Sequence, residues 1–253
     1  MDLNILKDQN SHPRDSRIKF DSENHIYSID DNNNYISVTQ LISNFFPRFD
    51  KDYWANKESI KTGMPKKEII KGWDEKGRKA REAGTHMHLQ IEKYYNNIEY
   101  EKNIEILKFL EFEKKYIKDK HQPYRTEWKI FDEDSFLAGT VDMVYKKKEG
   151  ELFIFDWKRS KNIINKDGTI DNKNPFENGK KGLSHLSSTD YNKYTLQQNI
   201  YKYILEKNYD KKISSMNLLI LHPNYLTFHI VQVPEMKDET EYLIEKSKKN
   251  ITL

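Results

Sequence analysis

The sequence predicts an α/β fold, with a central mixed β-sheet flanked by α-helices, an N-terminal β-meander and a helical layer. Short runs of β-branched and aromatic residues alternate with longer segments of helical periodicity. Two of these runs, 140–145 and 152–157, flank a charged turn and predict a β-hairpin. The length of 253 residues suits one domain with a buried core, so we expect a single domain over 1–253.

The composition excludes several kinds of site. The chain has no cysteine, which excludes disulfides, thiolate zinc sites and a Cys-ligated iron–sulfur cluster. No apolar run approaches the length of a membrane span, and residues 1–10 lack the apolar centre of a signal peptide. We therefore expect an intracellular protein, cytoplasmic or nucleoid-associated, that does not bind membranes. The net charge is only +3, so a nucleic-acid surface requires local clustering of cations.

Turn residues and short apolar runs define the N-terminal elements. Residues 1–17 are polar, and we expect them to be flexible. A helix over 39–46 ends before Pro47, because proline breaks a helix. This helix begins a helical layer that extends over 38–95. The three strands of the predicted meander are 17–20, 25–29 and 35–38.

Residues 50–81 are predicted to be helical and are dense in lysine, arginine and aromatic residues. Surfaces that bind single strands combine cations, which follow the phosphates, with rings that stack on bases. We interpret the segment as a DNA contact. The individual tryptophans, Trp54 and Trp73, are expected to pack inward.

The remaining elements follow from periodicity. An amphipathic helix is predicted over 102–118, and its apolar stripe is assigned to packing. Residues 162–192 are polar and aperiodic, which predicts a long loop. The stripe consists of Ile104, Leu107, Leu110, Phe112 and Tyr116. The other predicted elements are a strand at 124–131, a helix at 194–207, strands at 214–223 and 226–233, and a helix at 238–249.

The predicted hairpin carries two aspartates and a lysine. If 148–150 form a three-residue loop with Gly150 in the left-handed region, Asp142 lies opposite Asp156. Side chains alternate between the faces of a strand, so Asp156 and Lys158 share a face, which Asp142 joins in this register. A slip of one residue would place Asp142 on the other face.

Two carboxylates at this spacing repel each other and are costly to bury unless a cation lies between them. Mg²⁺ or Mn²⁺ suits such a pair, since these ions prefer oxygen ligands and bind substrate phosphates. Lys158 would orient an attacking water or stabilise charge that develops on a phosphate. The residues therefore suit phosphodiester hydrolysis. The alternative is a salt-bridged surface hairpin without chemistry.

This pattern resembles a known family. Asp142, followed by Asp156-Trp157-Lys158, is similar to the D…(D/E)-x-K motif of the PD-(D/E)XK nuclease superfamily. The residues 139–141 before Asp142, and Arg159-Ser160 after the lysine, resemble the RecB-like exonuclease branch. The resemblance implies a nuclease core over 121–223.

An upstream motif agrees with this resemblance. A helix is predicted over 85–95, and Thr85, His88 and Glu92 form a G-T-x-x-H pattern with an acidic residue four positions later. It resembles the upstream motif of the RecB-like and mitochondrial-type single-strand DNA exonucleases, in which the histidine lies beside the metal. His86 points about 200° away from His88 on a helix, so the two cannot bind one ion together.

A downstream motif follows in the order that the family shows. Gln197 and Tyr201 stand four apart on one helical face and resemble the Q-x-x-x-Y motif of the RecB-like branch. Relatives often carry a glutamate in the strand before the hairpin, which corresponds to Glu127 here. An edge-strand surface carboxylate is the alternative for Glu127.

The resemblance implies roles for these residues. Mg²⁺ or Mn²⁺ would be bound by Asp142, Asp156, His88 and the main-chain carbonyl of Trp157, while Lys158 assists the water nucleophile. The implied substrate-binding or supporting residues are Gln197, Tyr201, Glu127, Glu92, Thr85 and Ser160.

The expected activity is that of a metal-dependent DNA exonuclease, which hydrolyses phosphodiester bonds from DNA ends in recombination, repair or replication. No helicase motif is present, so a helicase or a single-strand-binding protein is an expected partner. Two alternatives stay open: a defence or structure-specific endonuclease on the same fold, and a non-catalytic DNA-binding module.

Overall fold

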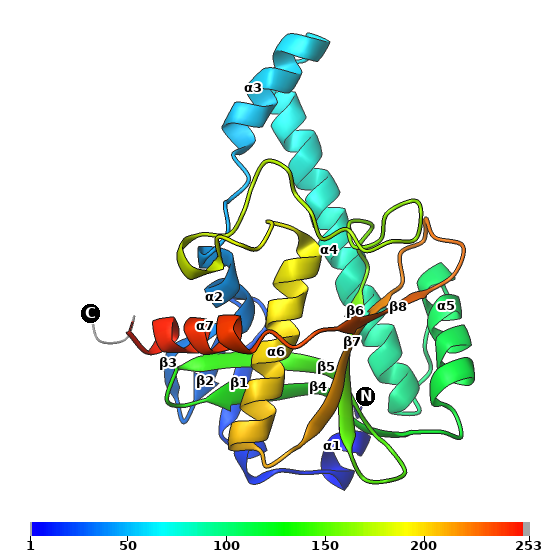
Figure 1. Ribbon diagram of the computed structural model, residues 1–253. Helices are drawn as coiled ribbons and strands as arrows, with labels where there is room; N and C mark the ends of the chain where they lie inside the picture. The colour runs from blue at the N-terminus through cyan, green and yellow to red at the C-terminus, as the bar shows by residue number, and fades with distance from the viewer. Residues whose placement is uncertain (1, 250–253) are drawn as a thin grey trace.

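The chain forms an α/β fold around one mixed sheet (Figure 1), as the sequence predicts. The structure is a computed structural model that describes residues 2–249. The strands in this range are β1 (Ile18–Asp21), β2 (Ile26–Ile29), β3 (Asn32–Ser37), β4 (Gln122–Asp132), β5 (Leu137–Lys146), β6 (Leu152–Lys158), β7 (Ile213–Ile220) and β8 (His229–Val233).

Helices cover both faces of the sheet. α2, α6 and α7 pack on one face, and α4 and α5 pack on the other. Within the described range, no helix combines the length and apolar character needed to cross a bilayer. The helices are α1 (Ile5–Gln9), α2 (Val38–Asn44), α3 (Lys51–Thr62), α4 (Lys66–Tyr95), α5 (Ile104–Phe112), α6 (Asp190–Asn208) and α7 (Lys237–Lys249).

The hairpin of β5 and β6 has the predicted register. Lys147 N–H donates to the Glu151 carbonyl over 2.8 Å, and Gly150 adopts φ 94°. The ladder then pairs Lys146 with Leu152 and continues to Met143 with Phe155. A glycine is required at position 150 because this backbone conformation is strained for other residues. The turn therefore sets the register on which the faces of both strands depend.

Two different strands, β3 and β6, pair with different parts of the same edge of β5. β4 pairs with β5 from Leu137 to Lys146 on one side, with an interruption at Asp142. On the other side, β3 pairs in parallel with Leu137 and Ala138, whereas β6 pairs only from Met143 onward. The stretch 139–142 is left without a strand partner on that edge, and we call it the fork. Backbone groups of an open edge need other partners, so the fork is where side chains and ligands can enter the sheet.

The predicted helical layer is present, with a different division into helices. α4 is one continuous helix of 30 residues, so the helix does not begin at Thr85 as predicted. A lone glycine at Gly84 does not end a helix whose flanking residues favour helical structure. α3 ends at Gly63, which adopts φ 72°. In Figure 1, α3 and the first half of α4 project away from the sheet. Trp54 lies there and is 45% exposed, so the prediction that it packs inward is wrong.

The apolar stripe predicted for the helix at 102–118 is only partly correct. Phe112 is buried and Leu110 packs against the core, as predicted. Ile104, Leu107 and Tyr116 are exposed, and Ile106 and Phe109 are buried instead. The buried face of the helix differs from the predicted one because it includes the stem of Lys108. Its ammonium donates to the main-chain carbonyls of His222, Pro223 and Tyr225. A lysine with a buried stem counts as polar in a periodicity pattern although it covers apolar surface.

The N-terminal segment was predicted to be flexible, but it packs against β4. Asp15 accepts hydrogen bonds from the Arg125 guanidinium at 2.8 Å and from Trp128 Nε1 at 3.0 Å. Arg125 is only 3% exposed. Its charge is thus compensated by a residue from the segment predicted to be frayed. The pairing is long-range, so no local pattern reveals it.

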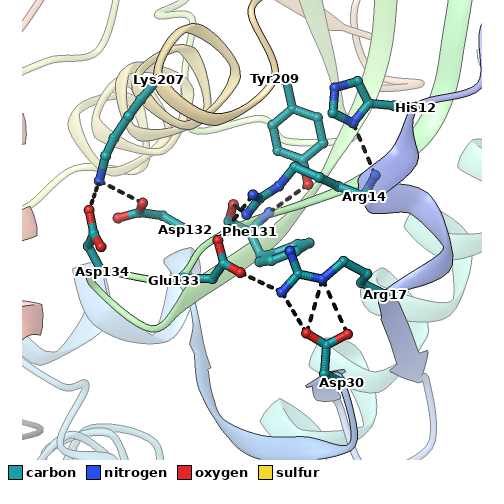
Figure 2. Close-up of polar contacts among 10 residues, drawn as sticks. All are labelled: His12, Arg14, Arg17, Asp30, Phe131, Asp132, Glu133, Asp134, Lys207 and Tyr209. Atoms are coloured by element: carbon teal, nitrogen blue, oxygen red, sulfur yellow. Dashed lines mark hydrogen bonds and ion pairs between the residues drawn. The ribbon is translucent and has the colours of Figure 1, made fainter.

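Figure 2 shows how the same segment is tied to the end of β4 and to α6. The Arg14 guanidinium lies 3.9 Å from the centre of the Phe131 ring. Arg17 forms ion pairs with Asp30 and Glu133. Lys207 of α6 bridges Asp132 and Asp134 at 2.8 and 2.7 Å. These contacts join the meander, β4 and α6 into one unit.

The Asp15–Arg125 pair yields a prediction about stability. Asp15→Ala leaves a buried guanidinium without its partner, so we expect the free energy of unfolding to fall by roughly 3–5 kcal/mol in urea denaturation. Asp74→Ala is the matched control, because it removes an exposed carboxylate that pairs with Lys51. It should cost less than about 1 kcal/mol. Equal losses in the two variants would contradict the assigned role of Asp15.

Candidate metal and catalytic site

Three carboxylates lie in line across three neighbouring strands at the fork. The β4–β5 register pairs Thr126 with Met143 and thereby places Glu127 opposite Asp142. The β5–β6 register, continued by one residue, places Asp142 opposite Asp156. Carboxylates in adjacent strands face each other at a few ångströms, where like charges repel. Positive charge must therefore lie nearby.

Glu127 has an unusual backbone. Its φ is 44°, in the left-handed region, although it lies inside a β-strand and is not a glycine. Non-glycine residues in this region cost free energy and cluster at functional sites. The distortion interrupts the ladder between the pairs that flank Glu127. Its carboxylate Oε1 lies 3.4 Å from His88 Nδ1.

His88 of α4 reaches the fork from the face that carries α4 and α5. Its Nδ1 lies 3.7 Å from Asp142 Oδ2, and its Nε2 lies 3.0 Å from the Trp157 carbonyl oxygen. The potential ligand atoms of His88, Glu127 and Asp142 all lie within 4.8 Å of one another. Asp142 Oδ2 also accepts a hydrogen bond from Trp157 N–H at 2.8 Å. An imidazole and two carboxylates thus lie close enough to hold one ion, and the Trp157 carbonyl contacts the other nitrogen of the same imidazole.

Asp156 and Lys158 lie on the opposite side of Asp142 and face α6. Lys158 Nζ lies 2.6 Å from Asp156 Oδ2 in an ion pair, yet this oxygen accepts no hydrogen bond of good geometry. The other oxygen accepts a hydrogen bond from Gln198 Nε2 at 3.2 Å. Asp156 is 1% exposed. The charge of this buried carboxylate is therefore balanced mainly by the Lys158 ammonium.

Lys158 is held between α6 side chains. Its Nζ donates to Gln197 Oε1 at 3.5 Å and lies 4.2 Å from the centre of the Tyr194 ring. Burial lowers the pKa of Lys158, but the negative charges of Asp156 and Asp142 outweigh it, so its pKa lies above the usual value. Lys158 is therefore an ammonium at neutral pH, which donates hydrogen bonds and does not accept protons.

Tyr201 closes the fork from the side of α6. Its hydroxyl accepts a hydrogen bond from Gln197 Nε2 at 2.8 Å. A Cβ atom on Gly139 would lie 2.5 Å from Tyr201 Cε1, so only glycine permits this approach. The chain of contacts from Gly139 through Tyr201 and Gln197 ends at Lys158. The backbone of the fork thereby sets the position of the lysine.

The charges at the fork shift several pKa values. Burial alone would lower the pKa of His88, but the carboxylates of Asp142 and Glu127 outweigh it and raise it to about 9. Burial raises the pKa of Asp156 to about 6, against the effect of Lys158. It likewise raises the pKa of Asp142. Without a bound metal, the His88 imidazolium thus supplies the positive charge between the carboxylates.

The residues predicted from the sequence do not all reach the fork. His88, Asp142, Asp156, Lys158, Gln197 and Tyr201 do, and so do Glu127 and the Trp157 carbonyl. Thr85 is exposed on α4, and Ser160 lies near Asp190, with 3.5 Å between Oγ and Oδ2. His86 lies away from His88, as predicted, with its Nε2 3.2 Å from Glu101.

Glu92 lies one helical turn beyond His88. It lines a cavity of about 140 Å³ together with Glu127 and Lys129. Burial, followed by the charge of Glu127, raises the pKa of Glu92 to about 7. Glu92 is not part of the group formed by His88, Glu127 and Asp142.

Sequence reasoning missed Tyr194 and Gln198, which contact Lys158 and Asp156. A signal for both was available. Residues at i, i+3, i+4 and i+7 share a helical face, and positions 194, 197, 198 and 201 have this spacing. The face of α6 that contains the predicted motif therefore also contains the missed residues.

Comparisons with known proteins leave the function open. No protein-family model matches the chain, and no curated protein matches it. Among solved structures, the crystal structure of SSO0001 is similar, with a TM-score of 0.37 and 13% identity. The similarity covers 87% of this chain and 77% of that chain. A likeness at this level carries no functional argument.

The close contact of Gly139 with Tyr201 yields a second prediction. Gly139→Ala forces the ring away, so we expect a loss of roughly 1–3 kcal/mol in unfolding free energy. Gly84→Ala is the matched control, since nothing lies within 4 Å of an added Cβ inside α4. It should stabilise the protein by up to about 1 kcal/mol. Chemical denaturation measures both, and destabilisation by Gly84→Ala alone would refute the packing argument.

The raised pKa values yield a third prediction, for the metal-free protein. The His88 imidazolium stabilises the native state fully below its unfolded pKa of 6.5, and this contribution is lost as pH rises through about 9. The raised pKa of Asp156 acts in the same direction, because the buried carboxyl loses its proton, at a cost in stability, as pH rises through about 6. In EDTA, the melting temperature should therefore fall between about pH 6 and pH 9.5.

Addition of Mn²⁺ should stabilise the protein more at high pH than at low pH, since metal ligands bind in their deprotonated forms. His88→Gln should remove most of the pH dependence between about pH 7 and pH 9. His86→Gln, which alters a histidine outside the fork, should retain it. A melting temperature in EDTA that stays constant over this range would contradict the charge assignment at His88.

Proposed function

We propose that the protein is a divalent-metal-dependent deoxyribonuclease of the PD-(D/E)XK type, which hydrolyses phosphodiester bonds from DNA ends. One observation carries the proposal: a group of metal-binding atoms and a buried lysine flank the same aspartate at the fork. His88 and Glu127 lie on one side of Asp142, and the Asp156–Lys158 pair lies on the other. A structural salt bridge does not require a histidine, a carbonyl and a strained glutamate in addition.

The donor set fits Mg²⁺ or Mn²⁺. Asp142, Glu127 and the Trp157 carbonyl offer oxygen atoms, and His88 offers a nitrogen that Mn²⁺ accepts readily. Asp156 lies on the other side of Asp142, where its Oδ2 pairs with the Lys158 ammonium. Such an ion, when bound, polarises a phosphate and lowers the pKa of a bound water.

The residues around the fork perform the remaining tasks. Lys158, as an ammonium, donates hydrogen bonds to an attacking water or to a phosphate oxygen, and its charge stabilises the negative charge that develops there. Gln197 and Tyr194 hold it in place. Because Lys158 cannot accept a proton, the proton from the water must leave through solvent or a carboxylate.

The charge of the chain supports a nucleic-acid substrate. The segment 48–81 contains eleven lysines and arginines but only six acidic residues, although the whole chain has a net charge of +3. α4 carries part of this segment and also carries His88. A polyanionic strand attracted to the segment is therefore held close to the fork.

The experiment that tests the proposal uses end-labelled linear single-stranded DNA, linear duplex and closed circular single-stranded DNA. Each is incubated with Mg²⁺, Mn²⁺ or EDTA. We expect metal-dependent loss of linear DNA while circles are spared. Lys158→Ala should lower the rate by about 10²-fold or more, because it removes a charge aimed at the reacting phosphate. Lys146→Ala, at an exposed lysine on the far end of β5, is the control and should retain activity.

Two outcomes of this experiment favour other functions. Cleavage of circles as fast as linear DNA would replace the exonuclease with an endonuclease. Binding of DNA without cleavage in either metal would identify a non-catalytic binding module and overturn the mechanism.

A further inference from the structure

A helical arm projects from the body of the protein. We define the arm as residues 48–81, which comprise α3 and the first half of α4 (Figure 1). Ala55 and Ile69 are its only buried residues. A hairpin of two helices with so few buried side chains gains little stability from its own packing. Its shape and surface therefore call for a functional explanation.

Aromatic side chains lie exposed on α3. Tyr53 and Trp54 are 50% and 45% exposed, and their ring centres lie 5.3 Å apart. Lys57 Nζ lies 4.7 Å from the Tyr53 ring centre and 5.1 Å from that of Trp54. These two half-exposed rings, with an ammonium over both of them, form what we call the ring patch. Rings exposed in this way offer faces on which planar groups can stack.

The arm that carries the ring patch is rich in cations. Several cationic side chains of the arm make no ion pair in the part of the chain that the structure describes. These residues are Arg48, Lys61, Lys67, Lys71, Lys76 and Arg81. Since cations outnumber acids nearly two to one on the arm but not elsewhere in the chain, the arm is complementary to a polyanion. A protein partner with an apolar patch would not require this excess of charge.

The ring patch is remote from the fork. Lys51, at the start of α3, forms an ion pair with Asp74 of α4. Asp74 precedes His88 by fourteen residues, which corresponds to about 21 Å along a helix. A stacked strand with a rise of about 3.4 Å per nucleotide spans this distance with about six nucleotides.

We propose that the ring patch of Tyr53, Trp54 and Lys57 is a second nucleic-acid site, which stacks unpaired bases of a strand whose scissile phosphate lies at the fork. The inference deepens the proposed nuclease function and rests on it. Bases in a duplex bury their faces against neighbouring pairs, so only unpaired bases can stack on the rings. Lys76 and Arg81, which lie on α4 between Asp74 and His88 and form no ion pair among the described residues, bind the phosphates between the two sites.

The test measures binding without cleavage. The full-length protein in EDTA is titrated into a fluorescein-labelled 20-nucleotide oligo(dT) and into a blunt duplex of the same length, and anisotropy gives Kd. The Tyr53→Ala/Trp54→Ala double variant should bind the single strand about tenfold more weakly or worse. Its affinity for the duplex should change by less than about twofold. Ile60→Ala, at a residue that is 86% exposed on the same helix, is the control and should leave both affinities unchanged.

The single variant Trp54→Phe should retain most of the single-strand affinity of the parent protein, because phenylalanine keeps an aromatic ring at this position. Unchanged single-strand affinity in the double variant would overturn the inference, and so would equal losses on both probes. The ring patch would be a protein interface instead if the parent protein self-associates while the double variant is monomeric and keeps its affinity for DNA. Because binding is measured in EDTA, the result does not depend on hydrolysis. A protein that binds strands through the ring patch but cleaves none would refute the nuclease proposal alone.

Discussion

Compensation of buried negative charge is the constraint on which the centre of this structure depends. Glu127, Asp142 and Asp156 lie in line across three strands, and burial makes an uncompensated charge on Asp142 or Asp156 costly. His88 balances the charge from one face of the sheet, and Lys158 balances it from the other. The helices that carry these cations, or the residues that hold them, must therefore stay docked on both faces at once. Removal of either cation leaves a buried carboxylate with a hydrogen bond but without its nearest opposite charge.

The fork explains why these groups can meet. A continuous sheet would pair the backbone of 139–142 and close the space between β5 and β6. Here β3 ends its pairing at Ala138 and β6 begins at Met143, so side chains from α4 and α6 enter from opposite faces. The main chain takes part directly, since Trp157 donates its N–H to Asp142 and directs its carbonyl to His88. The Trp157 side chain, by contrast, packs in the core beside α5.

Local patterns predicted most of this arrangement. Gly150 in a short charged turn was sufficient for the register of the hairpin, and helical spacing placed Gln197 and Tyr201 on one face. Features that depend on distant residues could not be predicted. The left-handed backbone of Glu127 arises inside an ordinary strand pattern, and Asp15 is held by an arginine 110 residues away. The exposure of Trp54 on the arm could not be predicted either. Periodicity identifies the apolar face of a helix, but it does not show whether another element packs against that face.

The glycines of α4 have a mechanical consequence. Gly72, Gly77 and Gly84 lie between the tip of the arm and His88, and no Cβ at Gly72 or Gly84 would meet a neighbour. Steric crowding thus does not explain them, although each weakens a helix by about 1 kcal/mol relative to alanine. α4 therefore bends most easily in the stretch from Gly72 to Gly84. A bend of about 5° near Gly84 would displace the start of α4, about 27 Å away, by about 2 Å. The arm can thus adjust its direction while His88 stays in place.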